Sequence, residues 1–129
     1  MSRLLLDTRL LIWALDEQDR LPVAIRDLIE NSSNESVFSP VSIWEIAIKA
    51  RLGRTDFGAR PDEIAAAAVA AGFVELPLHW QAAAAVADLP MHHRDPFDRV
   101  IVAQAMTEPI HLYTVDTKLA SYSPLVRVI

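Results

Sequence analysis

The sequence predicts an α/β fold: a three-layer α/β/α sandwich with a central, mainly parallel sheet of four to five strands. Short apolar runs alternate with longer helix-patterned segments along the whole chain, which is the order that parallel strands joined by crossover helices require. The chain has 129 residues, of which 52% are hydrophobic, enough for one buried core. Because we find neither an internal repeat nor a linker, we expect a single domain over residues 1–129.

The first half of the chain contains two predicted strands. The run RLLLD at 3–7 is short, apolar and ends in an acid, and SVFSP at 36–40 is similar in length. Apolar residues at helical spacing predict the helices in this half, over 8–15, 21–31 and 41–53. Gly53 follows the last of these at the position where a helix commonly ends.

The second half continues the alternation after a connection over 54–61. Predicted helices cover 62–72, 79–90, 95–108 and, as a short element, 117–122. Predicted strands cover 73–77, 110–116 and 125–129. The second helix-patterned segment ends at Pro90, since proline interrupts a helix, and the alanine-rich stretches are read as folded helix because alanine is the best helix former.

Composition excludes several classes of protein. The chain has no cysteine and only three glycines, so a thiolate zinc site, a disulfide framework and a glycine-rich phosphate loop are all absent. The net charge of −5 disfavours a protein that binds nucleic acid through a basic surface alone. No segment has the roughly 20 apolar residues of a membrane span, and no signal peptide is recognisable. We expect a soluble, cytoplasmic protein.

The stretch HRDPFDRVIVAQA, residues 93–105, places two acids at the start of an apolar helix. Asp95 is a good N-cap, Pro96 suits the first helical position, and Asp98 in the first turn suits the helix dipole. The alternative is that Asp98 belongs to an acidic cluster that binds a metal ion. The local sequence is compatible with both.

Three further acids have the same two interpretations. Asp7 and Asp116 each follow an apolar strand and precede a helix, as N-cap residues do. Glu45 lies four residues before Lys49, the favourable order for an ion pair on a helix surface. Taken singly, each acid is explained by structure alone.

Together, the four acids indicate a metal site. Helices begin where parallel strands end, so Asp7, Glu45, Asp98 and Asp116 converge on the carboxyl edge of the sheet. Carboxylates gathered there repel one another and raise each other's pKa unless a cation is present. Mg²⁺ or Mn²⁺ prefers oxygen ligands and can activate water toward a phosphodiester. The set therefore predicts metal-dependent phosphodiester hydrolysis.

Four segments resemble the PIN domain family, specifically the VapC-type toxin ribonucleases of bacterial toxin–antitoxin pairs. They are LLLDTRLLIWAL, SPVSIWEIAIKARLGR, LPMHHRDPFDRVIVAQA and LYTVDTKLASY, in order over nearly the whole chain. The patterns S-x-W-E-I-A-I-K and H-R-D-P-F-D-R-x-x-x-A-Q-A are the specific ones. The resemblance implies a metal-dependent endoribonuclease with a central parallel sheet, which forms a homodimer and is inhibited by a cognate VapB-like antitoxin.

Carried onto this sequence, the resemblance implies that Asp7 and Asp98 are the main ligands of Mg²⁺ or Mn²⁺. Glu45 and Asp116 would complete the site, directly or through water. Asp95 remains a helix cap or outer group. Many relatives have His or Asn where this chain has Arg9, so the departure concerns contacts with substrate rather than the acidic set.

Other polar and aromatic residues lie close in sequence to the four acids or within the predicted helices. His92, His93 and Arg94 either steer RNA phosphates to the site or form a solvated loop. Thr8 and Thr114 are expected to hydrogen-bond near the acids. The tryptophans could stack bases, but we expect core packing, in particular for Trp44.

Three other functions compete with this interpretation of the sequence. A haloacid-dehalogenase-type phosphatase needs a second Asp two residues after the first, and Arg9 occupies that position. A receiver-like domain needs adjacent acids after the first strand, and Thr8 follows Asp7 instead. A PIN scaffold without activity, acting only as a binding module for protein or RNA, remains the alternative that metal binding would discriminate.

Overall fold

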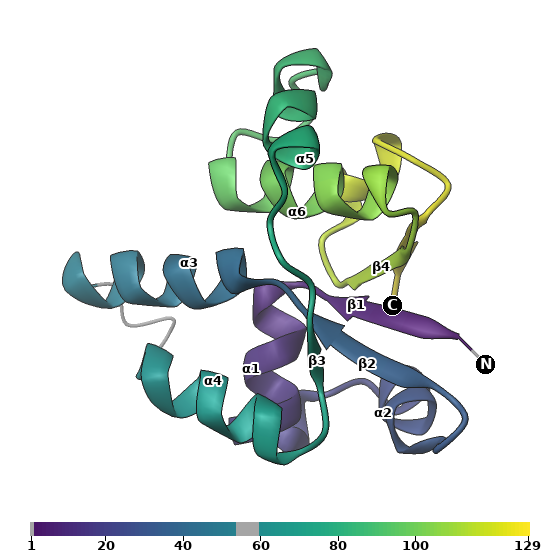
Figure 1. Cartoon of the computed structure of the whole chain (residues 1–129). Coiled ribbons are helices and arrows are strands. Elements are labelled where there is room, and N and C mark those ends of the chain that lie inside the picture. The colour runs from purple at the N-terminus through teal and green to yellow at the C-terminus, as the bar shows by residue number, and fades with distance from the viewer. Residues whose placement is uncertain (1, 54–59) are drawn as a thin grey trace.

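Five parallel strands form the central sheet, in the order β3-β2-β1-β4-β5. This computed structural model describes residues 2–53 and 60–129, so the segment 54–59 within the expected connection lies outside the described residues. The sheet confirms the predicted fold class, with β1 at its centre, between β2 and β4 (Figure 1). The strands are β1 Arg3–Leu6, β2 Glu35–Phe38, β3 Val74–Glu75, β4 His111–Thr114 and β5 Val126–Val128.

The helices lie where the sequence predicts them, with shorter ends in several places. They are α1 Thr8–Asp16, α2 Val23–Glu30, α3 Pro40–Arg51, α4 Pro61–Ala70, α5 Trp80–Ala85 and α6 Pro96–Thr107. The helix predicted over 79–90 is divided into α5 and a 3₁₀ turn at Val86–Asp88. The short helix predicted after β4 is a 3₁₀ turn at Thr117–Ser121.

The third strand is shorter than its predicted range of 73–77, because the chain leaves the sheet after two residues. Gln104 of α6 donates from Nε2 to the carbonyl oxygens of Leu76, at 3.1 Å, and Pro77, at 3.4 Å. Pro77 also lacks the N–H that a continuing strand would need. The chain therefore crosses from the layer of α4 to the layer of α5 and α6 at this point (Figure 1).

Two apolar cores, one on each face of the sheet, hold the three layers together. Leu4 and Leu6 of β1 pack with α1, α2 and α4 on one face, while Leu5 packs with α6 on the other. Successive side chains of a β-strand point to opposite faces of the sheet, which explains this division. Because both faces are covered by helices, Leu4, Leu5 and Leu6 of β1 are all apolar and fully buried rather than alternating with polar residues.

Polar caps begin the helices at the carboxyl edge of the sheet. Asp7 accepts from Leu10 N at 2.9 Å to start α1, and Ser39 accepts from Val41 N at 3.0 Å to start α3. At the other helix ends, Gly53 follows α3 with φ +75° and Gly72 follows α4 with φ +87°, a region that residues with a Cβ rarely adopt. These glycines confirm the predicted helix stops.

The expectation that Trp44 belongs to the core is wrong. Its side chain is 56% exposed, whereas Ile46 of the same helix is fully buried. Helix α3 is apolar on more than one side, so helical spacing could not identify the buried side. The Trp44 ring instead packs edge-on against Phe97 of α6, with ring centroids 5.0 Å apart.

Candidate active site

The carboxyl edge of the sheet carries a pocket of about 390 Å³ that contains all four predicted acids. Asp7 follows β1, Asp116 lies two residues after β4, Glu45 lies in α3, and Asp98 is the third residue of α6. The pocket is lined by Asp7, Thr8, Arg9, Glu45, Lys49, His93, Asp95, Asp98, Val115, Asp116 and Thr117. The structure therefore brings the four acids together and adds several groups that the sequence had not placed with them.

Asp7 is fixed in the pocket by hydrogen bonds to both of its carboxylate oxygens. Leu10 N donates to Oδ1 at 2.9 Å, and Thr114 Oγ1 donates to Oδ2 at 2.5 Å. The side chain is only 6% exposed. Burial raises the pKa of Asp7 to about 6, although the bonds from Thr114 and Leu10 lower it, and the charge of Glu45 adds to the rise. The Thr114 contact confirms the hydrogen bond expected beside this acid.

Asp98 is the least compensated acid in the pocket. In the described part of the chain its carboxylate accepts no hydrogen bond, and His93 Nε2 lies 3.6 Å from Oδ2. The pKa of Asp98 is raised to about 8, mainly by burial and further by the negative charges of its carboxylate neighbours. These neighbours are Asp95, Glu45, Asp7 and Asp116. Near neutral pH this carboxyl group therefore holds a proton unless a positive charge takes the proton's place.

Glu45 is buried and engaged on both oxygens. Thr8 Oγ1 donates to Oε1 at 2.6 Å and also hydrogen-bonds Ser42 Oγ at 2.9 Å. Lys49 Nζ donates to Oε2 at 2.5 Å. Glu45 is 3% exposed, so its pair with Lys49 is not the surface ion pair that helical spacing suggests. The pair instead forms one wall of the acidic pocket.

Lys49 also reaches the start of α6. Its Nζ lies 3.4 Å from Asp95 Oδ2, and its side chain is 18% exposed. Burial by itself lowers the pKa of Lys49, but the hydrogen bond and charge of Glu45, with those of Asp95, raise it above its ordinary value. The group is therefore an ammonium ion that links α3 to α6.

Asp95 serves as the helix cap that the sequence predicts. Its Oδ1 accepts from Phe97 N at 2.9 Å and from Asp98 N at 3.2 Å. Its backbone N–H donates to His93 Nδ1 at 3.0 Å. The capping carboxylate thus orients Asp98 from one side while its own amide fixes the ring of His93.

His93 and Asp116 form the remaining wall of the pocket. Because Nδ1 of His93 accepts the Asp95 N–H, the neutral ring carries its hydrogen on Nε2, which donates to Asp116 Oδ2 at 2.8 Å. Asp116 Oδ1 accepts from Lys118 N at 3.0 Å. One ligand atom each from His93, Asp98 and Asp116 lies within 4.8 Å of the others. The hydrogen on Nε2 makes His93 a donor to Asp116 rather than a metal ligand in this arrangement.

The segment that carries His93 is held from behind by Arg99 and Tyr122. The hydroxyl of Tyr122 accepts from His93 N at 2.9 Å and from Arg99 Nη1 at 3.2 Å. The buried guanidinium also donates to three backbone carbonyl oxygens of the preceding segment, those of Val86, Leu89 and Pro90. Sequence reasoning missed these supports because they join positions far apart in the chain.

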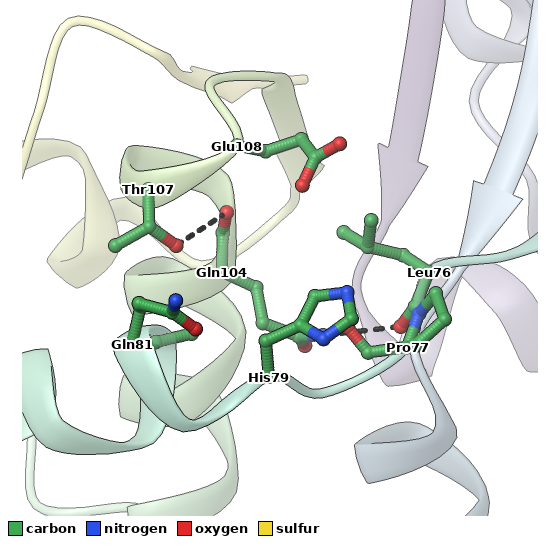
Figure 2. A pocket seen from close by; sticks show the side chains of 8 residues that line it. Leu76, Pro77, His79, Gln81, Gln104, Thr107 and Glu108 are labelled. Carbon is green, nitrogen blue, oxygen red and sulfur yellow. Dashed lines mark hydrogen bonds between the residues drawn. The ribbon is translucent and has the colours of Figure 1, made fainter.

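A second pocket, of about 410 Å³, lies between the segment after β3 and the C-terminal end of α6 (Figure 2). It is lined by Leu76, Pro77, His79, Gln81, Ala82, Gln104, Thr107 and Glu108. Figure 2 shows Gln104 reaching across it to Leu76. With one carboxylate and no cluster of charged groups, this pocket lacks the means for phosphodiester chemistry that the acidic pocket has.

The donor groups of the acidic pocket fit a hard divalent cation. They are carboxylate oxygens, the ligands that Mg²⁺ and Mn²⁺ prefer, and the carboxylate of Asp98 accepts no hydrogen bond from residues 2–53 and 60–129. A family model of the PIN domain matches residues 4–123. The chain belongs to the PIN domain family.

Solved structures share the fold of this PIN domain. VapBC2 from Rickettsia felis, bound to a DNA fragment from its promoter, has a TM-score of 0.68 and 13% identity over 99% of this chain and 98% of that one. DNA-bound VapBC from Salmonella typhimurium has a TM-score of 0.68 and 19% identity over 100% and 98% of the two chains. VapBC-5 from Mycobacterium tuberculosis, of a toxin–antitoxin family, has a TM-score of 0.55 and 21% identity over 100% and 98%.

At these identities the likeness establishes the fold of the PIN domain and not its substrate. Among curated protein sequences there is no significant match. Within residues 2–53 and 60–129, none of the helices combines the length and the apolar character that a membrane-spanning helix needs.

Proposed function

We propose that this PIN domain is a VapC-type toxin, an endoribonuclease that requires Mg²⁺ or Mn²⁺ and hydrolyses RNA phosphodiester bonds in the cytoplasm. The observation that carries the proposal is the gathering of four acids in one pocket, among which Asp98 accepts no hydrogen bond within the described residues. Its carboxyl group has a pKa of about 8, raised by burial and by four neighbouring carboxylates. A divalent cation stabilises such a group in its charged form, which makes metal binding the natural role of the pocket.

Asp7 and Asp98 are the main metal ligands in this proposal, and Glu45 and Asp116 complete the site directly or through water. A bound divalent cation supplies charge stabilisation at a phosphoryl oxygen and makes water a better nucleophile. Thr114 holds Asp7 and Thr8 holds Glu45, so both carboxylates are oriented before substrate arrives. Such fixed positions reduce the reorganisation that catalysis requires.

The basic side chains of the pocket have two proposed roles, contact with RNA and orientation of the acids. Arg9 is exposed at the pocket rim and lowers the pKa of Asp7 by its charge. We assign to Arg9 a contact with an RNA phosphate, since a guanidinium pairs well with phosphate oxygens. His93 donates to Asp116 and so fixes the carboxylate that would orient the attacking water.

The proposed partners are an RNA substrate, a cognate VapB-like antitoxin and a second copy of the chain in a homodimer. The similar solved structures are described as VapBC toxin–antitoxin assemblies, which supports an antitoxin for this chain. The acidic pocket would accept a basic side chain from that antitoxin, because carboxylates outnumber cations in its lining.

Cleavage of a mixed RNA pool tests the proposal. Purified protein is incubated with Mg²⁺, Mn²⁺ or EDTA, beside Asp98→Asn and the control Asp62→Asn, an exposed acid outside the pocket. We expect metal-dependent cleavage by the wild type and the control, and loss of at least about 100-fold in Asp98→Asn. Cleavage in EDTA would contradict the metal requirement. No cleavage and no calorimetric metal binding would leave only a binding scaffold.

A further inference from the structure

Lys49 occupies an unusual place for a lysine in an acidic pocket. Its Nζ lies between Glu45 Oε2, at 2.5 Å, and Asp95 Oδ2, at 3.4 Å. These carboxylates belong to different elements, α3 and the start of α6. Two acids that face a common cation in this way are arranged much as they would be around a metal ion.

We propose that the ammonium group of Lys49 takes the place of a second metal ion beside Glu45 and Asp95, so that the pocket binds one divalent cation. The inference rests on the proposed function, because it concerns the metal content of the same site. It assigns the single ion to the side of the pocket that contains Asp7, Asp98 and Asp116.

The hydrogen bonds distinguish Asp98 from the other four acids of the pocket, each of which accepts at least one hydrogen bond within the described residues. On the Lys49 side, Glu45 has a donor on each oxygen, from Thr8 and from Lys49. On the other side, Asp98 accepts no hydrogen bond within the described residues. A cation gains most where the carboxylate lacks donors, so the Asp98 side is where the ion is needed.

The charges of the residues that line the pocket also favour a single bound divalent ion. Five carboxylates and two permanent cations, Arg9 and Lys49, line the pocket, which gives a formal charge of −3 when every acid is ionised. One divalent ion brings the pocket to −1, whereas two would make it positive. Without Lys49 the lining, which still includes Arg9, would carry a formal charge of −4, and two divalent ions would neutralise it.

Titration with MnCl₂ in a calorimeter tests the inference on purified wild type, Lys49→Met and Lys49→Arg. Lys49→Met removes the charge and keeps much of the side-chain length, and Lys49→Arg is the matched control that keeps the charge. We expect one Mn²⁺ per chain in the wild type and in Lys49→Arg, and two in Lys49→Met. Circular dichroism shows whether each variant is folded, and Lys49→Gln replaces Lys49→Met if the latter is not.

The possible outcomes separate the two proposals. Two Mn²⁺ ions in the wild type, or a single ion in the folded neutral variant, would overturn the role of Lys49 while the nuclease proposal stands. Absence of any Mn²⁺ binding in the wild type would overturn the metal site itself, and with it this inference. A rise from one to two ions on loss of the ammonium supports both.

Discussion

His93 Nε2 lies 2.8 Å from Asp116 Oδ2, and the opposite ring nitrogen accepts the N–H of Asp95. The ring therefore couples the acid after β4 to the residue that caps α6. A carboxylate held by such a donor keeps its orientation when a ligand binds, as the outer partners of metal ligands do.

Replacement of His93 should therefore weaken the site without unfolding the protein. We expect His93→Ala to lower Mn²⁺ affinity or kcat/KM for RNA by about 10–100-fold, the usual effect of removing an outer partner of a ligand. His93→Gln, which retains an N–H donor of similar reach, should recover part of the loss. Unchanged affinity and kcat/KM in His93→Ala, at an unchanged melting temperature, would show that the contact has no positioning role.

The metal-free protein should lose stability as the pH rises. Asp98 has a pKa of about 8 and Asp7 of about 6 in the folded state, against an ordinary value of 3.8. At a pH between the ordinary pKa of 3.8 and the raised pKa of each group, the folded protein holds a proton that the unfolded chain has released. Raising the pH through this range therefore favours unfolding. The larger part of the loss comes from Asp98, whose pKa lies farther above its ordinary value than that of Asp7. Thermal melts in EDTA across this range would measure it.

The Asp98→Asn variant distinguishes the contribution of Asp98 to the pH dependence of stability from that of Asp7. The variant removes the group that titrates near pH 8 but retains Asp7, so its stability should fall only up to about pH 6 and then stay level. At about pH 8 the metal-free variant should be more stable than the metal-free wild type. A parallel decline of both proteins above about pH 6 would show that Asp98 is not the titrating group.

Mg²⁺ should reverse the loss of stability in the wild type. A ligand that binds only the folded state stabilises it by about 2.7 kcal/mol when present at 100 times its Kd. We expect a rise in melting temperature of the wild type at about pH 8 and little change in Asp98→Asn. Equal shifts in the two proteins would mean that the ion binds away from this pocket.

Arg99 should matter for stability more than its neighbour Arg94. The Arg99 guanidinium is buried and donates to backbone carbonyls and to Tyr122, whereas Arg94 is exposed. We expect Arg99→Met to lower the free energy of unfolding by roughly 1.5–3 kcal/mol, the value of hydrogen bonds to a charged group. Arg94→Met is the matched control and should change it by less than about 0.5 kcal/mol. Urea unfolding compares the two.

The acids were predictable because their positions follow from local rules. Strand ends and helix starts meet at one edge of a parallel sheet, and this placed Asp7, Asp98 and Asp116 near one another before any contact was known. The role of Asp95 followed from the chemistry of helix caps. Both arguments use only neighbouring residues and the order of elements.

Local rules do not predict the surroundings of three other side chains, those of Lys49, His93 and Trp44. Lys49 faces the pocket because of the rotation of α3, and that helix is apolar on several sides, which also hid the exposure of Trp44. His93 depends on the path of its loop, which Arg99 fixes from the far side. These features arise from tertiary contacts, and no spacing in the sequence reports them.

The early departure of the chain from β3 also limits association between molecules. An exposed edge strand can pair with a strand of another protein and begin aggregation. Here that edge has only Val74 and Glu75, and the carbonyls of Leu76 and Pro77 are bonded to Gln104. A strand from another molecule could pair with only these two residues, because the chain then leaves the plane of the sheet. This edge of the sheet is therefore protected against intermolecular sheet growth.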